Sequence, residues 1–215
     1  MTLLRIDASI LGAHSASKEL ADLVLAEWSN ERPDEKIVTR HLGSDPLPSD
    51  AWAITVGAGY TPADQLSDAQ KAANALAGEL YQELVSADAI VLAFPLYNWG
   101  VSAHVKTWID LVIAGAQGAG RTPADPILEG KPVVLLTTRG GSYAKGTPKE
   151  GWDHSTPYLR RILADNWGAS LTVVEREFTL VGVNPALDQF ADQGAELKRI
   201  AHEAAISAGK ALAGR

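Results

Sequence analysis

The sequence contains no cysteine. This absence excludes disulfide bridges, thiolate metal ligands, catalytic thiols and dithiol redox motifs. Any redox activity of this chain must therefore come from a bound cofactor. The histidines at positions 14, 41, 104, 154 and 202 show no metal-ligand spacing, so we expect no metal site.

Positive charge and long apolar runs are also scarce. The chain has 19 Lys and Arg residues and 26 Asp and Glu residues, which gives a net charge of -7. This charge disfavours nucleic acid or an anionic membrane as a partner. No stretch approaches the ~18 apolar residues of a membrane span. Arg5 and Asp7 also interrupt any apolar signal-peptide region near the N-terminus. We expect a cytoplasmic protein with no nucleic-acid or membrane partner.

The remaining composition is that of a globular protein. Hydrophobic residues make up 46% and charged residues 21% of the chain, which argues against disorder and fibrous structure. The length suits one large domain. Because no repeat, low-complexity segment or linker divides the sequence, we expect a single domain over residues 1–215.

Hydrophobic periodicity predicts five strands that alternate with five helices. The predicted strands cover residues 3–8, 36–42, 89–94, 132–138 and 170–180. The first predicted helix begins at Ser15 to Ser17, and the other four cover residues 67–86, 102–114, 155–167 and 185–213. Residues 43–64 and 115–130 are expected to be long connections. This alternation indicates a doubly wound α/β fold, a parallel sheet with helices on both faces. Such sheets bind ligands beyond the carboxyl ends of their strands.

The loop after the first predicted strand carries three serines around the start of a helix. Ser9, Ser15 and Ser17 lie where unpaired N–H groups and the helix dipole favour an anion. Neither a P-loop motif nor a GxGxxG motif is present. The pattern suggests a phosphate cup built from hydroxyls and amides, and the alternative is simple helix capping by Ser15.

The loops after the third and fourth predicted strands also carry candidate ligand-binding residues. In the third loop, Tyr97, Asn98 and Trp99 offer flat and polar groups that suit a planar heteroaromatic ring; the alternative is a Pro turn with core aromatics. In the fourth loop, Gly140 and Gly141 let the backbone approach a ligand closely; the alternative is an ordinary flexible turn. Because the strands are parallel, we expect all three loops at one edge of the sheet.

Together these segments resemble the FMN-dependent NADH-azoreductases, which are flavodoxin-like NAD(P)H:quinone and azo-compound reductases. The likeness is carried, in chain order, by Ser9…Ser15-x-Ser17, Pro95-Leu96-Tyr97-Asn98-Trp99 with Lys106 and Asp110, Arg139-Gly140-Gly141, Thr156-Pro157-Tyr158-Leu159 and Trp167-Gly168. It implies a flavodoxin-like sheet of strand order 2-1-3-4-5 and a homodimer with two flavin sites near the interface. It also implies tightly bound FMN, with NADH or NADPH as the electron donor.

The resemblance implies three groups of FMN contacts. The phosphate would meet Ser9, Ser15, Ala16 and Ser17; the isoalloxazine ring would lie along Pro95, Leu96, Tyr97, Asn98 and Trp99; its pyrimidine end would meet Thr138, Arg139, Gly140 and Gly141. No side chain is expected to be catalytic, because the flavin carries the chemistry. Asn98 and the amides of Gly140 and Gly141 are expected to tune the ring.

The sequence departs from the family pattern at Trp99, where an aromatic ring is kept, and in residues 115–128, which alone bear on the choice of electron acceptor. Trp99 stands where Phe is usual, and residues 115–128 contain no aromatic residue where the family often has an aromatic stretch over the flavin.

The likeness implies that a ping-pong hydride mechanism reduces quinones and azo compounds, with the physiological acceptor left open. Two alternatives remain, a flavodoxin-like electron carrier or flavin-binding module without turnover, and a dimeric scaffold that has lost FMN. The charges at residues 175–177 are expected to mark a solvated strand edge.

Overall fold

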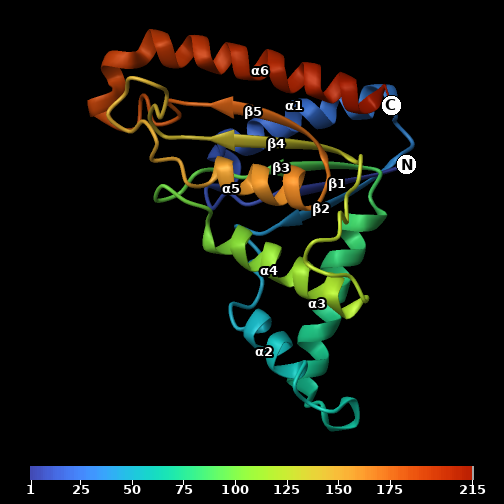
Figure 1. The fold of residues 1–215 in the computed structure, drawn as a ribbon. Coiled ribbons are helices and arrows are strands. Elements are labelled where there is room, and N and C mark those ends of the chain that lie inside the picture. The colour runs from blue at the N-terminus through green and yellow to red at the C-terminus, as the bar shows by residue number, and fades with distance from the viewer. Residues whose placement is uncertain (215) are drawn as a thin grey trace.

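The computed structural model describes residues 1–214 and contains one five-stranded sheet of order β2-β1-β3-β4-β5 (Figure 1). Every neighbouring pair of strands is parallel. The strands are β1 (Thr2–Asp7), β2 (Lys36–His41), β3 (Ala89–Ala93), β4 (Pro132–Thr138) and β5 (Ser170–Arg176). The predicted α/β fold and strand order are confirmed.

The central strands are buried on both faces and end together. All five residues of β3 are buried and apolar, as expected when helices cover both faces of a parallel sheet. Ala93, the last residue of β3, is paired with Asp7 of β1 and with Leu136 of β4. The loops that follow these three strands therefore begin at the same edge of the sheet.

Helices cover the sheet on its two sides (Figure 1). One hydrophobic cluster joins α1 (Ala16–Glu31) and α6 (Ala191–Ala213) to one face. The other joins α3 (Asp68–Ser86), α4 (Ala103–Gly118) and α5 (Thr156–Arg160) to the opposite face. None of the helices within residues 1–214 has the length and apolar character needed to cross a membrane.

Two of the expected connections are partly helical. Residues 43–64 contain α2 (Ala51–Ala58), which packs on α3 at the end of the molecule away from the sheet (Figure 1). The predicted helix end at residue 114 was wrong, because α4 continues to Gly118. A Cβ on Gly115 would lie 2.1 Å from the Ala77 carbonyl oxygen. Gly115 therefore allows α3 and α4 to pack closely and does not end the helix.

The C-terminal third differs from the prediction in its element boundaries. Strand β5 ends at Arg176 rather than at residue 180, and Phe178 takes a left-handed φ of 55° soon afterwards, which ends extended structure. The helix predicted for residues 155–167 consists of α5 and a π-helical turn, Arg161–Asn166. A 3-10 helix, Pro185–Phe190, precedes α6 where one continuous helix was predicted.

Candidate functional site at the carboxyl edge of the sheet

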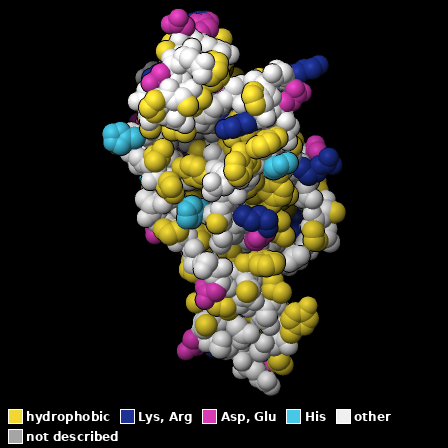
Figure 2. All heavy atoms as spheres, turned by 90° about the vertical axis from the view of Figure 1, so that its left-hand side faces the viewer, with side chains coloured by type: hydrophobic (Ala, Val, Ile, Leu, Met, Phe, Trp, Pro, Cys, Tyr) yellow, Lys and Arg dark blue, Asp and Glu magenta, His cyan; other side chains and the backbone are white. Residues whose placement is uncertain are grey.

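Three loops meet at the carboxyl edge of the sheet: the β1 loop (residues 8–15), the β3 loop (residues 94–102) and the β4 loop (residues 139–155). The Tyr97 hydroxyl lies 3.2 Å from Ser9 Oγ and accepts a hydrogen bond from the Ile10 N–H at 3.1 Å. The Leu96 N–H donates to the Thr138 carbonyl oxygen at 2.9 Å. Figure 2 looks onto this edge and shows apolar side chains gathered at its centre. The predicted convergence of the three loops is confirmed.

The serines of the first group surround the N-terminus of α1. Ser15 caps the helix and accepts a hydrogen bond from the Lys18 N–H at 3.1 Å. Its Oγ also lies 3.1 Å from the Oγ of buried Ser17. The first intrahelical donor is the Glu19 N–H, at 3.0 Å from the Ser15 carbonyl oxygen, so the amides of Ala16 and Ser17 have no intrahelical acceptor. Capping by Ser15 is therefore compatible with anion binding, because two amides and the helix dipole remain available.

The β3 loop presents its residues in a strained turn. Pro95 and Leu96 are buried, whereas Asn98 and Trp99 are exposed. Asn98 and Trp99 both take left-handed conformations, with φ values of 48° and 65°, and the Gly100 N–H closes the turn on the Tyr97 carbonyl at 3.0 Å. Asn tolerates this conformation better than other non-glycine residues, whereas for a bulky residue such as Trp99 it costs about 1–2 kcal/mol. Strain of this kind, held at a loop that displays an indole ring, is characteristic of binding sites.

The start of the β4 loop leaves backbone donors free. The carbonyl oxygens of Arg139, Gly140 and Gly141 accept hydrogen bonds from the N–H groups of residues 178–180, at 3.1 to 3.4 Å. The amides of Gly140 and Gly141 have no acceptor within the described chain, residues 1–214. Thr138 is buried beside them, and the buried Thr137 Oγ1 also lacks a partner among those residues. This edge can therefore donate hydrogen bonds to a carbonyl-bearing ligand.

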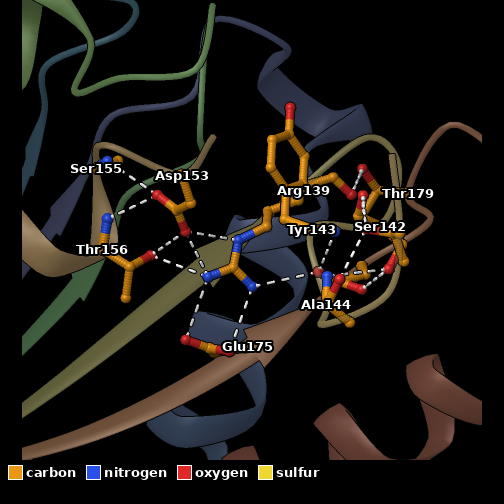
Figure 3. A network of polar contacts seen from close by, with 11 residues as sticks. Arg139, Ser142, Tyr143, Ala144, Asp153, Ser155, Thr156, Glu175 and Thr179 are labelled. Atoms are coloured by element: carbon orange, nitrogen blue, oxygen red, sulfur yellow. Dashed lines mark hydrogen bonds and ion pairs between the residues drawn. The ribbon is translucent and has the colours of Figure 1, made fainter. Parts of the chain in front are cut away.

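Arg139 has a different environment from its neighbours, as Figure 3 shows. Its side chain is only 7% exposed and forms ion pairs with three carboxylates, those of Asp153, Glu175 and Glu177. The guanidinium Nε donates to Asp153 Oδ2 at 2.8 Å, Nη2 donates to Thr156 Oγ1 at 3.0 Å, and both Nη atoms donate to the Glu175 carboxylate at 3.2 Å. The side chain is thus committed to a network inside the protein. Its main chain is hydrogen-bonded as well: the Arg139 N–H donates to the Arg176 carbonyl oxygen at 2.8 Å, and the Arg139 carbonyl oxygen accepts from the N–H and the hydroxyl of Thr179, each at 3.1 Å. The free donors of this loop are therefore the amides of Gly140 and Gly141, not Arg139.

The acidic partners of Arg139 were not found from the sequence. The interpretation of residues 175–177 as a solvated strand edge holds only in part. Strand β5 is an edge strand and Glu175 is 42% exposed, but Glu175 also binds Arg139, and Glu177 is 14% exposed and holds the β4 loop. The Glu177 carboxylate accepts hydrogen bonds from the Ser142 hydroxyl at 2.5 Å and the Tyr143 N–H at 2.7 Å. No local sequence signal identifies these partners, because Glu175 lies 36 positions from Arg139.

Electrostatics keep this network ionised. Burial alone would raise the pKa of Asp153, but hydrogen bonds from Thr156 and the charge of Arg139 outweigh it and hold that pKa below its ordinary value. Burial works against the charge of Arg139 as well, yet Glu175 and Asp153 raise the pKa of its guanidinium. Burial, together with the charge of Asp153, raises the pKa of Tyr143, so its phenol stays protonated at neutral pH.

The sequence also gave no reason to place Trp152 at this edge. Its ring packs edge-to-face against Trp99, with the ring centroids 6.0 Å apart and an interplanar angle of 77°. The two loops are joined there by the His154 N–H, which donates to the Trp99 carbonyl oxygen at 2.9 Å. In the sequence, Trp152 differs from its neighbours only as an indole in a loop otherwise rich in Gly, Lys and Glu, which does not indicate a contact with Trp99.

Of two cavities, one lies away from the junction of these loops and the other reaches the β1 loop. One of about 770 Å³ separates α2 from α3 and α4 and is lined by Thr55, Tyr60, Gly78, Tyr81 and Gln117 among others. Another, of about 560 Å³, lies between α1 and α6 and reaches Ser15, Arg176 and His202. Residues 1–214 contain no group of three or more His, Asp or Glu side chains arranged to hold a metal ion. The free amides and the exposed β3 loop lie at the junction of the three loops and not at the cavity beside α2, so the junction is the candidate site.

Comparison with known proteins connects this geometry to a family. A family model described as a flavodoxin-like fold matches residues 1–198. A protein of Frankia casuarinae named FMN-dependent NADH:quinone oxidoreductase is 40% identical over 190 residues, which cover 88% of this chain and 90% of that protein. A protein of Streptomyces coelicolor with the same name is 34% identical over 218 residues, covering 100% of this chain and 96% of that one.

Solved structures share the architecture. The crystal structure of the azoreductase AzrA superposes with a TM-score of 0.75 and 24% identity, and the alignment covers 100% of both chains. An FMN-dependent NADH-azoreductase from Bacillus anthracis str. Ames Ancestor, in complex with FMN, gives a TM-score of 0.75 at 19% identity and covers 99% of this chain and 100% of that one. At these identities the likeness shows a common fold.

Proposed function

This chain belongs to the FMN-dependent NADH:quinone oxidoreductase family of flavodoxin-like proteins, and on that premise we propose that it binds FMN where its three loops meet and uses NADH or NADPH to reduce quinones and azo compounds. The observation that carries this proposal is the set of free amides at that edge. Ala16 and Ser17 offer two of them at a helix N-terminus, and Gly140 and Gly141 offer two more beside the strained β3 loop.

The residues present suit FMN. A phosphate would be held by the amides of Ala16 and Ser17 with the hydroxyls of Ser9, Ser15 and Ser17, supported by the positive end of α1. A net negative protein can bind this anion because the donors are local and fixed. The aromatic ring would lie along residues 95–99, with its carbonyl-bearing end at the free amides of the β4 loop.

The chemistry comes from the cofactor. When bound, FMN supplies two-electron transfer in a ping-pong sequence, so that NADH, a proton and a quinone become NAD⁺ and a hydroquinone. The protein binds and orients the ring and stabilises its charge. The amides of Gly140 and Gly141 are placed to stabilise negative charge at the ring's carbonyl end, in the manner of an oxyanion hole. Asn98, exposed on its strained turn, is placed to orient the ring.

We also propose that the protein works as a homodimer in the cytoplasm. Helix α2 projects from the far end of α3 (Figure 1), and Trp52, Val56 and Tyr60 are exposed along it and at its end. Large apolar side chains grouped on one protruding helix favour contact with another chain. A second copy of this chain is the partner that the family resemblance implies.

Colour and its response to NADH test the proposed function. We expect the purified protein to be yellow, to bleach when NADH is added without oxygen, and to regain its colour when a quinone follows. A yellow protein that NADH does not bleach would instead be an electron carrier. A colourless protein that takes up no added FMN would be a scaffold, and either result contradicts the proposal.

A further inference from the structure

Trp99 and Trp152 form an aromatic pair on the outer surface of the candidate site. Trp99 is 48% exposed and Trp152 is 49% exposed, although their rings pack edge-to-face with centroids 6.0 Å apart. The aromatic contacts of the core, such as Phe94 with Trp108, involve fully buried rings. The surface pair leaves about half of each indole in water, so burial in the core does not account for its position.

Both indoles are mounted on fixed backbone. The Trp99 turn is closed by the hydrogen bond between Gly100 and Tyr97, and its carbonyl holds the His154 N–H at 2.9 Å. The Trp152 N–H donates to the Lys149 carbonyl oxygen at 3.1 Å. The next residue, Asp153, is bound by Arg139 and by the N–H groups of Ser155 and Thr156 (Figure 3). The backbone that carries the two rings is therefore held by contacts that do not depend on the pair itself.

A half-exposed pair of indoles on fixed backbone suits a flat apolar ligand. Trp side chains supply a large contact area, and ring pairs prefer offset or edge-on packing that leaves a face open. The Trp99–Trp152 wall stands where the β3 and β4 loops meet, the same loops that supply the exposed Asn98 and the free amides of Gly140 and Gly141. A flat molecule bound between those loops would therefore find the two indoles on the same loops as the free amides.

We propose that Trp152, together with Trp99, is a specificity-determining residue that binds the fused second ring of a planar acceptor and so favours polycyclic over single-ring quinones. This proposal rests on the proposed function, because it assigns the acceptor side of the same site. A second ring extends across the indole faces and gains apolar contact there, whereas a single ring fills only the space beside the amides.

Binding in the absence of NADH tests the proposal without turnover. The FMN-loaded protein and its W152A and W152F variants are titrated with menadione, a two-ring quinone, and with duroquinone, which has one ring, and both dissociation constants are measured calorimetrically. We expect W152A to weaken menadione binding roughly three- to tenfold and to change duroquinone binding less than about twofold. W152F keeps an aromatic ring and should restore most of the menadione affinity. I200A, which truncates a half-exposed apolar residue of α6, is the control and should change neither constant.

The outcomes separate the two proposals. A protein that binds FMN and is bleached by NADH, but whose W152A variant binds menadione as the parent does, contradicts the acceptor wall and leaves the proposed function standing. Equal losses for both quinones in W152A also contradict it, since they indicate general damage to the site. A protein that takes up no FMN overturns both proposals.

Discussion

Arg139 Nη2 lies 2.6 Å from Asp153 Oδ2, and both side chains are largely buried, at 7% and 13% exposed. This ion pair joins the first residue after β4 to a residue 14 positions later and thereby closes the β4 loop. The free amides of Gly140 and Gly141 lie at one end of the closed segment and Trp152 at the other. The pair therefore fixes the shape of one side of the candidate site without touching a ligand.

Asp153→Asn should destabilise the protein. The substitution removes the carboxylate that Arg139 shares with Thr156 and leaves a buried guanidinium short of one partner. Because Glu175 and Glu177 remain, we expect a loss of about 1–3 kcal/mol, less than the full cost of an unpaired buried charge. Urea unfolding followed by circular dichroism measures it. Asp165→Asn, which breaks the exposed pair with Arg161, is the matched control and should cost less than about 0.5 kcal/mol; equal costs would contradict the structural role of the Arg139 pair.

The same carboxylate should make stability depend on acid pH. The pKa of Asp153 is lower in the folded protein than in the unfolded chain. Its contribution to stability is therefore fully present above the unfolded value, about 3.9, and is lost as the pH falls through the folded value. We expect the parent protein to lose stability more steeply below about pH 4 than Asp153→Asn does. Parallel urea titrations from pH 6 to pH 3 measure this, and identical slopes would mean that Asp153 does not contribute.

Ser17→Ala should weaken FMN binding with little effect on the fold. Ser17 is buried, and its hydroxyl contacts only Ser15 Oγ among the residues described. One lost hydrogen bond to a charged phosphate corresponds to about 1.5–3 kcal/mol, or roughly a 10- to 100-fold rise in the dissociation constant for FMN. Quenching of flavin fluorescence on titration into apoprotein gives that constant. Ser15→Ala is a poorer test because it also removes the helix cap. Unchanged FMN affinity in Ser17→Ala would reject the phosphate cup.

The parts predictable from sequence were those that depend on local pattern. Buried apolar runs fixed the positions of β3 and β4, and parallel pairing then brought the loops after β1, β3 and β4 to one edge. Hydroxyls at a helix start and paired glycines after a strand were visible in the same way. These signals need no knowledge of distant contacts.

The parts that could not be predicted depend on contacts between distant positions. Arg139 meets Glu175 across 36 residues, and nothing local distinguishes that glutamate from a solvated one. Trp152 meets Trp99 only because the two loops fold against each other. Helix α2 is stabilised by packing on α3 rather than by an amphipathic pattern of its own. The continuation of α4 past Gly115 depends likewise on close contact with Ala77.

Gly140→Ala tests how tightly the free amides are held. A Cβ at this position would lie 2.6 Å from Leu180 Cδ1 and 3.0 Å from its Cγ, so either Leu180 or the β4 loop must move. We expect a loss of about 1–3 kcal/mol in the free energy of unfolding together with weaker FMN binding. Gly141→Ala is the matched control, because the nearest atom to its Cβ is the mobile Lys149 Nζ at 3.9 Å. It should change stability by less than about 0.5 kcal/mol.

A second substitution identifies the cause of that loss. The double variant Gly140→Ala/Leu180→Ala lacks the Leu180 carbons that would clash with the new Cβ. Adding Gly140→Ala to a Leu180→Ala background should therefore destabilise the protein much less than adding it to the parent. A double-mutant cycle measures this difference as a coupling energy. The Leu180 N–H would still bind the Gly140 carbonyl, so the loop keeps its backbone contact. If the two substitutions are additive, the glycine is needed for its backbone rather than for the space beside Leu180. Restored stability without restored FMN affinity would mean that the amides have shifted although the clash is relieved.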